Sequence, residues 1–298
     1  MKTNSQRLIV LFCFFIILLT ATAIKERLDF FSPQSITQPF KSIKTTEASA
    51  IEITIDNKTT SLYKKQNHWF QKHDKEEYQA DENRINKILQ NIKDLEKGEI
   101  YSTNKNKHRE FGIDKQKITV KIPNQNIVIY VGNNAGIDKT YTRIDQSNEV
   151  FISTGLNGIF YPADFRDFAV YFINDESKVT SVEIKYDNFS AVLKKNNNNW
   201  TINNKNAKKD RVEFFLNDLS TLKAQDFNQE NPKSNPELVI QVKENNMINN
   251  AEFFLPGNQD EKDKQIYYLR TSNSNKIFEI PAVYVSSLKK EEKDFIDE

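Results

Sequence analysis

The chain of 298 residues has 42 basic and 41 acidic side chains, so its formal net charge is only +1. Near-neutrality argues against a nucleic-acid binder, which needs a surplus of lysine and arginine to displace phosphate counterions. Seven glycines and one cysteine argue against a collagen, a glycine-rich phosphate loop, a disulfide framework and a cysteine metal site. The length suits one large domain or two of ordinary size.

The N-terminus contains an uncharged apolar segment, Leu8 to Ile24, which includes the only cysteine of the chain. Lys2 and Arg7 precede it, and this positive flank predicts that the body of the protein is translocated across the membrane. As a helix the segment would span about 25 Å, slightly less than a hydrocarbon core of ~30 Å. We expect a retained membrane anchor. The small residues before and at Ala23 leave open a second interpretation, a signal peptide cleaved after that residue.

The rest of the chain contains one pattern twice. Residues 51–55 and 182–186 alternate apolar and polar side chains, as strands with one buried face do. Each segment is followed by a polar turn, a second strand and a tryptophan. These indoles, Trp69 and Trp200, are the only two in the chain, and each lies 18 residues after the first strand residue of its unit.

A stripe of apolar residues at helical spacing follows each tryptophan. The first stripe is Ile85, Ile88, Leu89, Ile92 and Leu95; the second, 127 positions later, is Val212, Phe215, Leu216, Leu219 and Leu222. Asp81 and Asp210 stand where an N-cap carboxylate would accept the first amide protons of each helix, and Gly98 is a predicted C-cap. Five matches in register indicate a duplicated helix.

Further strands complete each unit. We predict them at residues 117–122, 127–131, 141–144 and 150–152, matched by 238–242, 251–255, 267–269 and 277–280, and Gly132 matches Gly257 at one strand end. A short helical stretch then closes each unit, and Phe168 matches Phe295 there. The predicted fold class is α+β: an N-terminal transmembrane helix followed by two tandem repeats of a mostly antiparallel sheet with one main covering helix.

This organisation gives four parts. Residues 1–24 are the anchor or signal peptide, and residues 25–49, with mixed charge and little periodicity, form a tether. Residues 50–173 form the first α+β repeat and residues 179–298 the second.

The order of these elements resembles the DUF4340 family, a family of domains of unknown function. The residues of the resemblance are Trp69, the helix opened by Asp81, the element Phe111-Gly112-Ile113, the strand that finishes in Gly132, and an apolar closing helix leading to Phe165-Arg166-Asp167. The second unit has no Phe-Gly-Ile element, so its connector is expected to pack differently. The resemblance implies an envelope protein associated with ABC-type export systems of the gliding-motility kind, and it implies no catalytic residues.

The candidate partner-binding residues are aromatic, because exposed tryptophans and aromatic patches anchor partners or stack on sugars. They are Trp69, Trp200, Phe160, Tyr161, Phe165 and Phe168. For both tryptophans the favoured interpretation is packing of the strands onto the helix, since they occupy equivalent positions. Asp164 and Asp167 are the one pair that suggests acid–base chemistry, and we favour structural roles for them.

The sequence therefore predicts a non-enzymatic scaffold without cofactor or metal, anchored by residues 8–24 in the inner membrane with its body on the periplasmic side. Its expected partners are the membrane, through residues 8–24, and proteins of a membrane complex. No nucleic-acid partner is expected, and the sequence does not indicate a small-molecule ligand. Two alternatives stay open: a module that binds envelope glycan through its tryptophans, and a hydrolase with an unrecognised carboxylate site. The partner, the transported material and the oligomeric state do not follow from the sequence.

Overall fold

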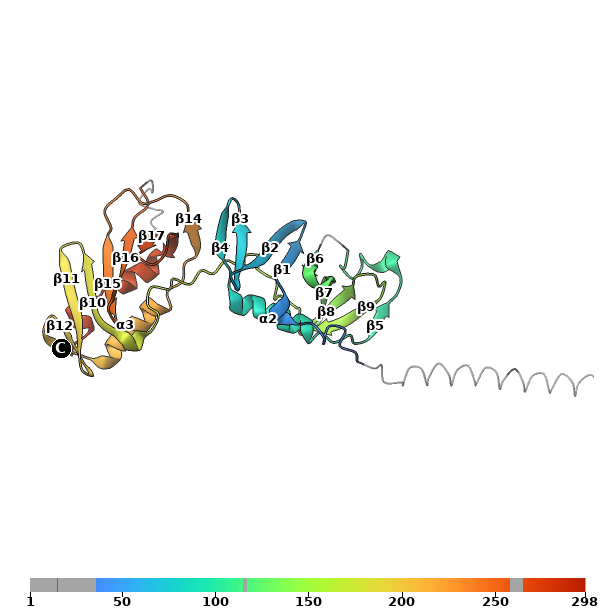
Figure 1. The fold of residues 1–298 in the computed structure, drawn as a ribbon, viewed down its shortest axis with the longest axis horizontal. Coiled ribbons are helices and arrows are strands. Elements are labelled where there is room, and N and C mark those ends of the chain that lie inside the picture. The colour runs from blue at the N-terminus through green and yellow to red at the C-terminus, as the bar shows by residue number, and fades with distance from the viewer. Residues whose placement is uncertain (1–14, 16–35, 115–116, 258–264, 298) are drawn as a thin grey trace, which may run out of the picture. The chain divides into compact units, whose positions relative to one another are not determined.

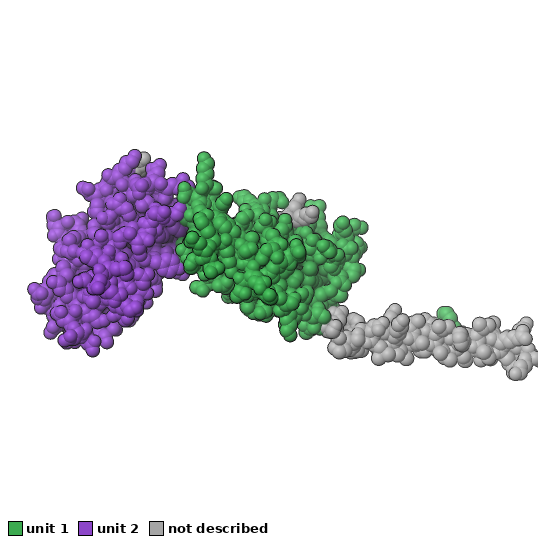
Figure 2. Space-filling model, in the orientation of Figure 1, with its two compact units in different colours: residues 1–167 green, residues 168–298 purple. Residues whose placement is uncertain are grey.

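The computed structural model describes residue 15 and residues 36–114, 117–257 and 265–297 (Figure 1). The predicted membrane segment, residues 8–24, lies outside the described residues except for Phe15. Among the residues that are described, no helix is both long enough and apolar enough to cross a bilayer. The chain divides into two compact units, residues 1–167 and 168–298 (Figure 2).

The first unit contains a nine-stranded sheet with the order β4-β3-β2-β1-β6-β7-β8-β9-β5 and the helix α2 (Glu82–Lys93). Its strands are β1 (Ala50–Ile55), β2 (Lys58–Lys65), β3 (His68–His73), β4 (Glu76–Gln79), β5 (Ile100–Ser102), β6 (Ile118–Ile122), β7 (Ile127–Gly136), β8 (Lys139–Ile144) and β9 (Val150–Thr154). Short 3-10 helices span Thr45–Glu47, Lys105–Lys107 and Pro123–Gln125.

The second unit repeats this arrangement with the order β13-β12-β11-β10-β15-β16-β17-β18-β14. Its strands are β10 (Val179–Tyr186), β11 (Phe189–Asn196), β12 (Asn199–Ile202), β13 (Lys205–Ala207), β14 (Asp226–Asn228), β15 (Leu238–Glu244), β16 (Met247–Phe254), β17 (Ile266–Thr271) and β18 (Ile277–Pro281). Its helices are α3 (Lys209–Ser220) and α4 (Ala282–Leu288), with 3-10 helices at Glu176–Lys178 and Glu292–Asp294.

The two strand orders coincide when each strand of the second unit is matched to its counterpart nine places earlier in the numbering. All strand pairs within both sheets are antiparallel. The predicted α+β class with mostly antiparallel sheets is confirmed.

Each sheet buries one face under its helix. In β1 the residues Ile51, Ile53 and Ile55 are buried and alternate with half-buried polar residues, as the sequence pattern predicts. All ten residues of the two predicted helical stripes are buried as well. Burial of an apolar side chain contributes about 1.5–3 kcal/mol, so these stripes fix each helix on its sheet.

The helix ends were predicted correctly at only one of three positions. Asp81 is the N-cap of α2, and its Oδ1 accepts a hydrogen bond from the Arg84 amide at 3.0 Å. Asp210 is not an N-cap: α3 begins after Lys208, so Asp210 lies in the first helical turn. The start of α3 is set by a distant contact, because the Lys208 amide donates to the Phe295 carbonyl at 2.7 Å. Gly98 is not a C-cap, since α2 ends at Lys93.

The predicted tether is wrong for residues 36–49, which fold onto the first unit. Thr37 forms an isolated antiparallel bridge with Lys97, in the loop that follows α2 in the sequence. Phe40, Ile43 and Ala48 are buried in the core of this unit. Their apolar side chains have no regular spacing, so periodicity did not reveal them.

The second unit has the same kind of leading segment. Ala169 bridges to Lys223 behind α3, and Val170 and Phe172 are buried in the second core. Residues 168–173, predicted to end the first repeat, therefore begin the second unit, whose boundary lies after Asp167. Each unit therefore starts with a leading segment that forms a β-bridge with the loop that follows its main helix in the sequence.

Strand register corrects one predicted equivalence. Ile53 pairs with Val120, which pairs with Ile129. The same two steps in the second unit run from Ile184 through Ile240 to Ala251. Three residues further along these strands, Gly132 corresponds to Phe254 and not to Gly257.

The closing segment of the first unit is not a helix, although the sequence predicted one. Residues 155–168 have irregular backbone, whereas α4 occupies the matching place in the second unit. Gly155 and Gly158 have φ values of +77° and +71°, a backbone conformation that interrupts a right-handed helix. Pro162 lacks the amide proton that a helix interior needs.

Candidate functional site

Both tryptophans belong to the hydrophobic cores. Trp69 is 1% exposed and Trp200 is 3% exposed, so neither indole face is accessible to a sugar or a partner in this fold. The Lys64 ammonium lies 5.1 Å from the Trp69 ring centroid, and the Lys195 ammonium lies 5.8 Å from that of Trp200. An identical lysine–tryptophan contact in both units indicates a structural role.

The same two lysines hold the leading segments. Lys64 Nζ donates to the Thr46 carbonyl at 3.1 Å, and Lys195 Nζ donates to the Ser177 carbonyl at 3.3 Å. Both acceptors are the middle residue of a 3-10 helix that precedes the first strand of the unit. The tryptophan, the lysine and the leading segment thus form one duplicated packing element.

The other four candidate residues do not form a single surface. Phe160 and Phe165 are at most 1% exposed and lie in the core of the first unit. Tyr161 is 53% exposed. Phe168 is half-buried against the core of the second unit, where its ring stacks on Phe227 with centroids 5.3 Å apart.

Asp164 takes part in an ion pair and is not placed for acid–base chemistry. Its two carboxylate oxygens accept hydrogen bonds from Arg166 Nε at 3.0 Å and from Arg166 Nη2 at 2.6 Å. Burial by itself would raise the pKa of Asp164, but the hydrogen bonds and charge of Arg166 outweigh it and hold that pKa below its ordinary value. The Asp167 amide donates to the Gln79 carbonyl, which extends the edge of the sheet.

No cluster of three or more histidine, cysteine or carboxylate side chains suited to a metal ion occurs in the part of the chain that the structure describes.

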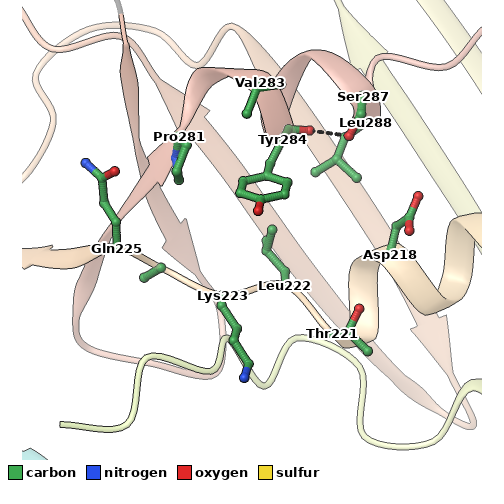
Figure 3. Close-up of a pocket in the computed structure, with 11 residues that line it drawn as sticks. Asp218, Thr221, Leu222, Lys223, Gln225, Pro281, Val283, Tyr284, Ser287 and Leu288 are labelled. Carbon is green, nitrogen blue, oxygen red and sulfur yellow. Dashed lines mark hydrogen bonds between the residues drawn. The ribbon is translucent and has the colours of Figure 1, made fainter. Parts of the chain in front are cut away.

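The second unit has an open groove between the end of α3, the loop that follows it and α4 (Figure 3). Its volume is about 700 Å³. Leu222 and Leu288 are buried at its base, while Val283 and Tyr284 on α4 are 71% and 54% exposed. Figure 3 shows the Tyr284 ring and the Leu222 side chain facing each other across the gap. The sequence did not reveal this groove, because its residues come from two helices far apart in the chain.

In the first unit a hydrogen bond joins the end of α2 to the segment that follows β9. Asn91 on α2 has the position of Asp218 on α3, and Asn91 Nδ2 donates to the Gly155 carbonyl at 2.6 Å. A carboxylate has no proton to donate at neutral pH, so Asp218 cannot make this contact to a carbonyl. The polar Lys87 of the first unit corresponds to Phe214, which is 70% exposed and lies one turn before Asp218 on α3. The shared helix fold therefore does not require an apolar side chain at the position of Phe214.

These features define a class of protein built from two homologous antiparallel α+β units, one of which presents an apolar groove. The sequence model of DUF4340, a domain of unknown function, matches residues 69–238. The match covers more than half of the chain, from β3 of the first unit to the start of β15 in the second, and the chain belongs to this family. Comparisons with curated proteins and with solved structures found no similar protein.

Proposed function

We propose that this protein is a non-enzymatic scaffold that is anchored in the inner membrane and displays its two units on the periplasmic side. The groove of the second unit is its partner-binding site. The observation on which the proposal depends is the pair of exposed apolar side chains on α4, Val283 and Tyr284, which line the groove above the buried Leu222 and Leu288.

The anchor is supported by the uncharged segment of residues 8–24 and by the basic residues that precede it. The non-enzymatic role is supported by how the polar side chains are used. Asp164 is neutralised by Arg166, and the paired lysine contacts of the two units hold leading segments in place. A role as auxiliary component of an ABC-type transport or gliding complex rests on the family resemblance.

The groove suits a short segment of a partner protein that inserts an apolar side chain. Val283, Tyr284 and Leu222 offer apolar contact area. The side chains of Asp218 and Lys223 have no hydrogen bond or ion pair among the described residues, so both charges are available to polar groups at the rim of a partner.

Co-purification after gentle solubilisation tests this proposal. The full chain is compared with the variant Val283→Asp and with Tyr284→Ser, and retained proteins are quantified by mass spectrometry. The matched control is Ser286→Asp, which adds the same charge to α4 at an exposed position that does not line the groove.

We expect membrane-complex proteins to be retained by the full chain and by the control, and to fall at least tenfold in the two groove variants. A photo-crosslinking residue at position 283 should connect to the same proteins. Equal retention by all four chains, or recovery of every chain without a partner, would contradict the proposal.

A further inference from the structure

Exposed apolar side chains gather on the first unit near the start of its described chain. Ile36 is 65% exposed, Tyr101 47% and Ile137 97%. Ile36 and Tyr101 line one shallow depression together with Ala135 and Lys139, which flank the tip of the β7–β8 hairpin. Ile137 is at the tip of this hairpin, next to Ala135 and Lys139, and the three residues Ile36, Tyr101 and Ile137 are called here the hairpin patch.

The β7–β8 turn, Ile137-Asp138, differs from the other two-residue turns of the described sheets because it contains an apolar residue. The remaining two-residue turns in the described sheets contain only polar residues: Asp56-Asn57, Gln66-Asn67, Asp74-Lys75, Asp187-Asn188, Asn197-Asn198, Asn203-Asn204 and Asn245-Asn246. Polar residues are preferred because turns are exposed and often require positive φ. A fully exposed β-branched residue contributes nothing to the turn or to the core, which indicates a contact outside the unit.

The charges around the hairpin patch are mixed. Asp138 and Lys139 follow Ile137 directly, and Glu96 and Glu99 line the same depression. Lys97 is paired with Glu149 at 2.5 Å. The named acidic groups outnumber the basic ones, so attraction to anionic groups cannot drive binding, which must depend on apolar and aromatic contact.

Chain length limits where the hairpin patch can be. Ile36 is 12 positions after Ile24, the last residue of the predicted membrane segment. Even a fully extended chain of that length spans only about 40 Å. A unit of this size has a radius of gyration of about 14 Å, so the patch remains within about one unit diameter of the bilayer.

We propose that the hairpin patch docks the first unit on the lipid bilayer, with Ile137 and Tyr101 entering the interfacial region. Tyrosine is favoured at this depth because its ring is apolar and its hydroxyl reaches water. The inference rests on the proposed membrane anchor and adds a second contact to it. This contact fixes the orientation of the first unit relative to the membrane.

A depth measurement on the full chain tests the docking. The variant Ile137→Cys, in a Cys13→Ser background that removes the only native thiol, takes an environment-sensitive fluorophore. The chain is reconstituted in vesicles of phosphatidylcholine and phosphatidylethanolamine with or without nitroxide-labelled lipid. The matched control is Lys75→Cys, in the β3–β4 turn at the opposite edge of the same sheet.

We expect the label at position 137 to be blue-shifted and to be quenched at least threefold more strongly than the label at position 75. Replacing both Ile36 and Tyr101 by Ser should reduce the quenching at position 137 to the control level. Adding anionic phosphatidylglycerol should change it by less than twofold, since the surface has mixed charge.

Vesicle flotation separates failure of the docking from failure of the anchor. A chain that floats with vesicles while both labels report water would overturn the docking and leave the anchor standing. A chain that does not float would overturn the anchor and the docking together.

Discussion

The guanidinium carbon of Arg84 lies 4.0 Å from the centroid of the Phe165 ring. The same arginine donates from Nη1 to the Asp164 carbonyl at 2.6 Å, and so fastens the closing segment of the first unit to the first turn of α2. In the second unit Arg211, 127 positions later, donates from Nη1 to the Ile296 carbonyl. The closing segments are thus equivalent, although one contains a helix and the other does not.

The backbone supports this equivalence. The amide of Asp81 donates to the Phe165 carbonyl at 2.8 Å, and the amide of Lys208 donates to the Phe295 carbonyl at 2.7 Å. Both donors are N-caps of the main helix of their unit. Phe165 therefore corresponds to Phe295, which corrects the sequence-based match of Phe168 with Phe295. Exact helix starts in both units depend on residues more than 80 positions away in the chain.

Replacing Arg84 by Met should destabilise the first unit by about 2 kcal/mol, because backbone acceptors lose charge-assisted hydrogen bonds. Urea unfolding gives the free energy, and hydrogen exchange should show increased exchange in the first turn of α2 and in residues 164–167. Arg211→Met should do the same for α3. Arg109→Met is the control, since Arg109 is exposed; equal effects of all three changes would contradict the prediction.

Gly132→Ala should destabilise the first unit by about 3 kcal/mol. A Cβ atom at this position would lie 2.2 Å from the Phe111 carbonyl oxygen and 2.7 Å from Ile113 Cγ2. The connector Phe111-Gly112-Ile113 crosses the sheet here, and the Asn133 amide donates to the same Phe111 carbonyl at 2.9 Å. Overpacking of this kind typically costs 1–3 kcal/mol, and backbone cannot yield as a flexible side chain does.

Thermal and urea unfolding measure the effect of Gly132→Ala. Gly257→Ala is the matched control, because nothing lies within 4 Å of a Cβ atom built there. Its stability should stay within about 0.5 kcal/mol of the parent chain. An unaffected Gly132→Ala protein would show that the connector does not pack as described.

Asp164→Asn should destabilise the first unit by about 2 kcal/mol at neutral pH, because it removes the carboxylate charge that pairs with the buried Arg166 side chain at 2.6 Å. The pKa of Asp164 is lower in the folded chain than its ordinary value of 3.8. The ion pair therefore stabilises the fold fully above the unfolded pKa, and this contribution is lost as pH falls through the lower, folded pKa.

Unfolding free energies of the parent and Asp164→Asn chains should thus differ by a constant amount above about pH 5 and converge below pH 3.8. Urea titrations at several pH values measure this difference. A difference that stays constant down to pH 2.5 would show that the carboxylate charge is not its source.

Tryptophan fluorescence should report two buried indoles. Trp69→Phe and Trp200→Phe each leave a single emitter, and we expect blue-shifted emission and weak acrylamide quenching from both variants. Envelope glycan fragments should not change either spectrum. Since Trp69 Nε1 has no hydrogen-bond partner among the described residues, its replacement by Phe should cost only about 1–2 kcal/mol, for lost packing. Strong quenching or a glycan-induced shift would show that an indole is accessible.

Much of the fold could be predicted because alternation and helical spacing are local properties. In residues 51–55 and in the stripe from Ile85 to Leu95, the spacing of apolar residues predicts which face is buried, and the structure buries that face. Each of these two patterns occurs once in each unit. The edge strands β13 and β14 were not predicted, since each has three residues and shows no period. The candidate site was predicted poorly. Trp69 and Trp200 were correctly favoured as packing residues, but Phe160 and Phe165 are core residues as well.

The sequence by itself determined the class of the fold, the duplication and the buried face of each main element, because these follow from which neighbours in the chain are apolar. Only the tertiary structure decided where each unit begins, where α3 starts and which repeat keeps an open groove. Those outcomes depend on single contacts between distant residues, such as Asn91 with Gly155 and Lys208 with Phe295. No local pattern encodes such a contact, because each partner is selected by the packing of the whole unit.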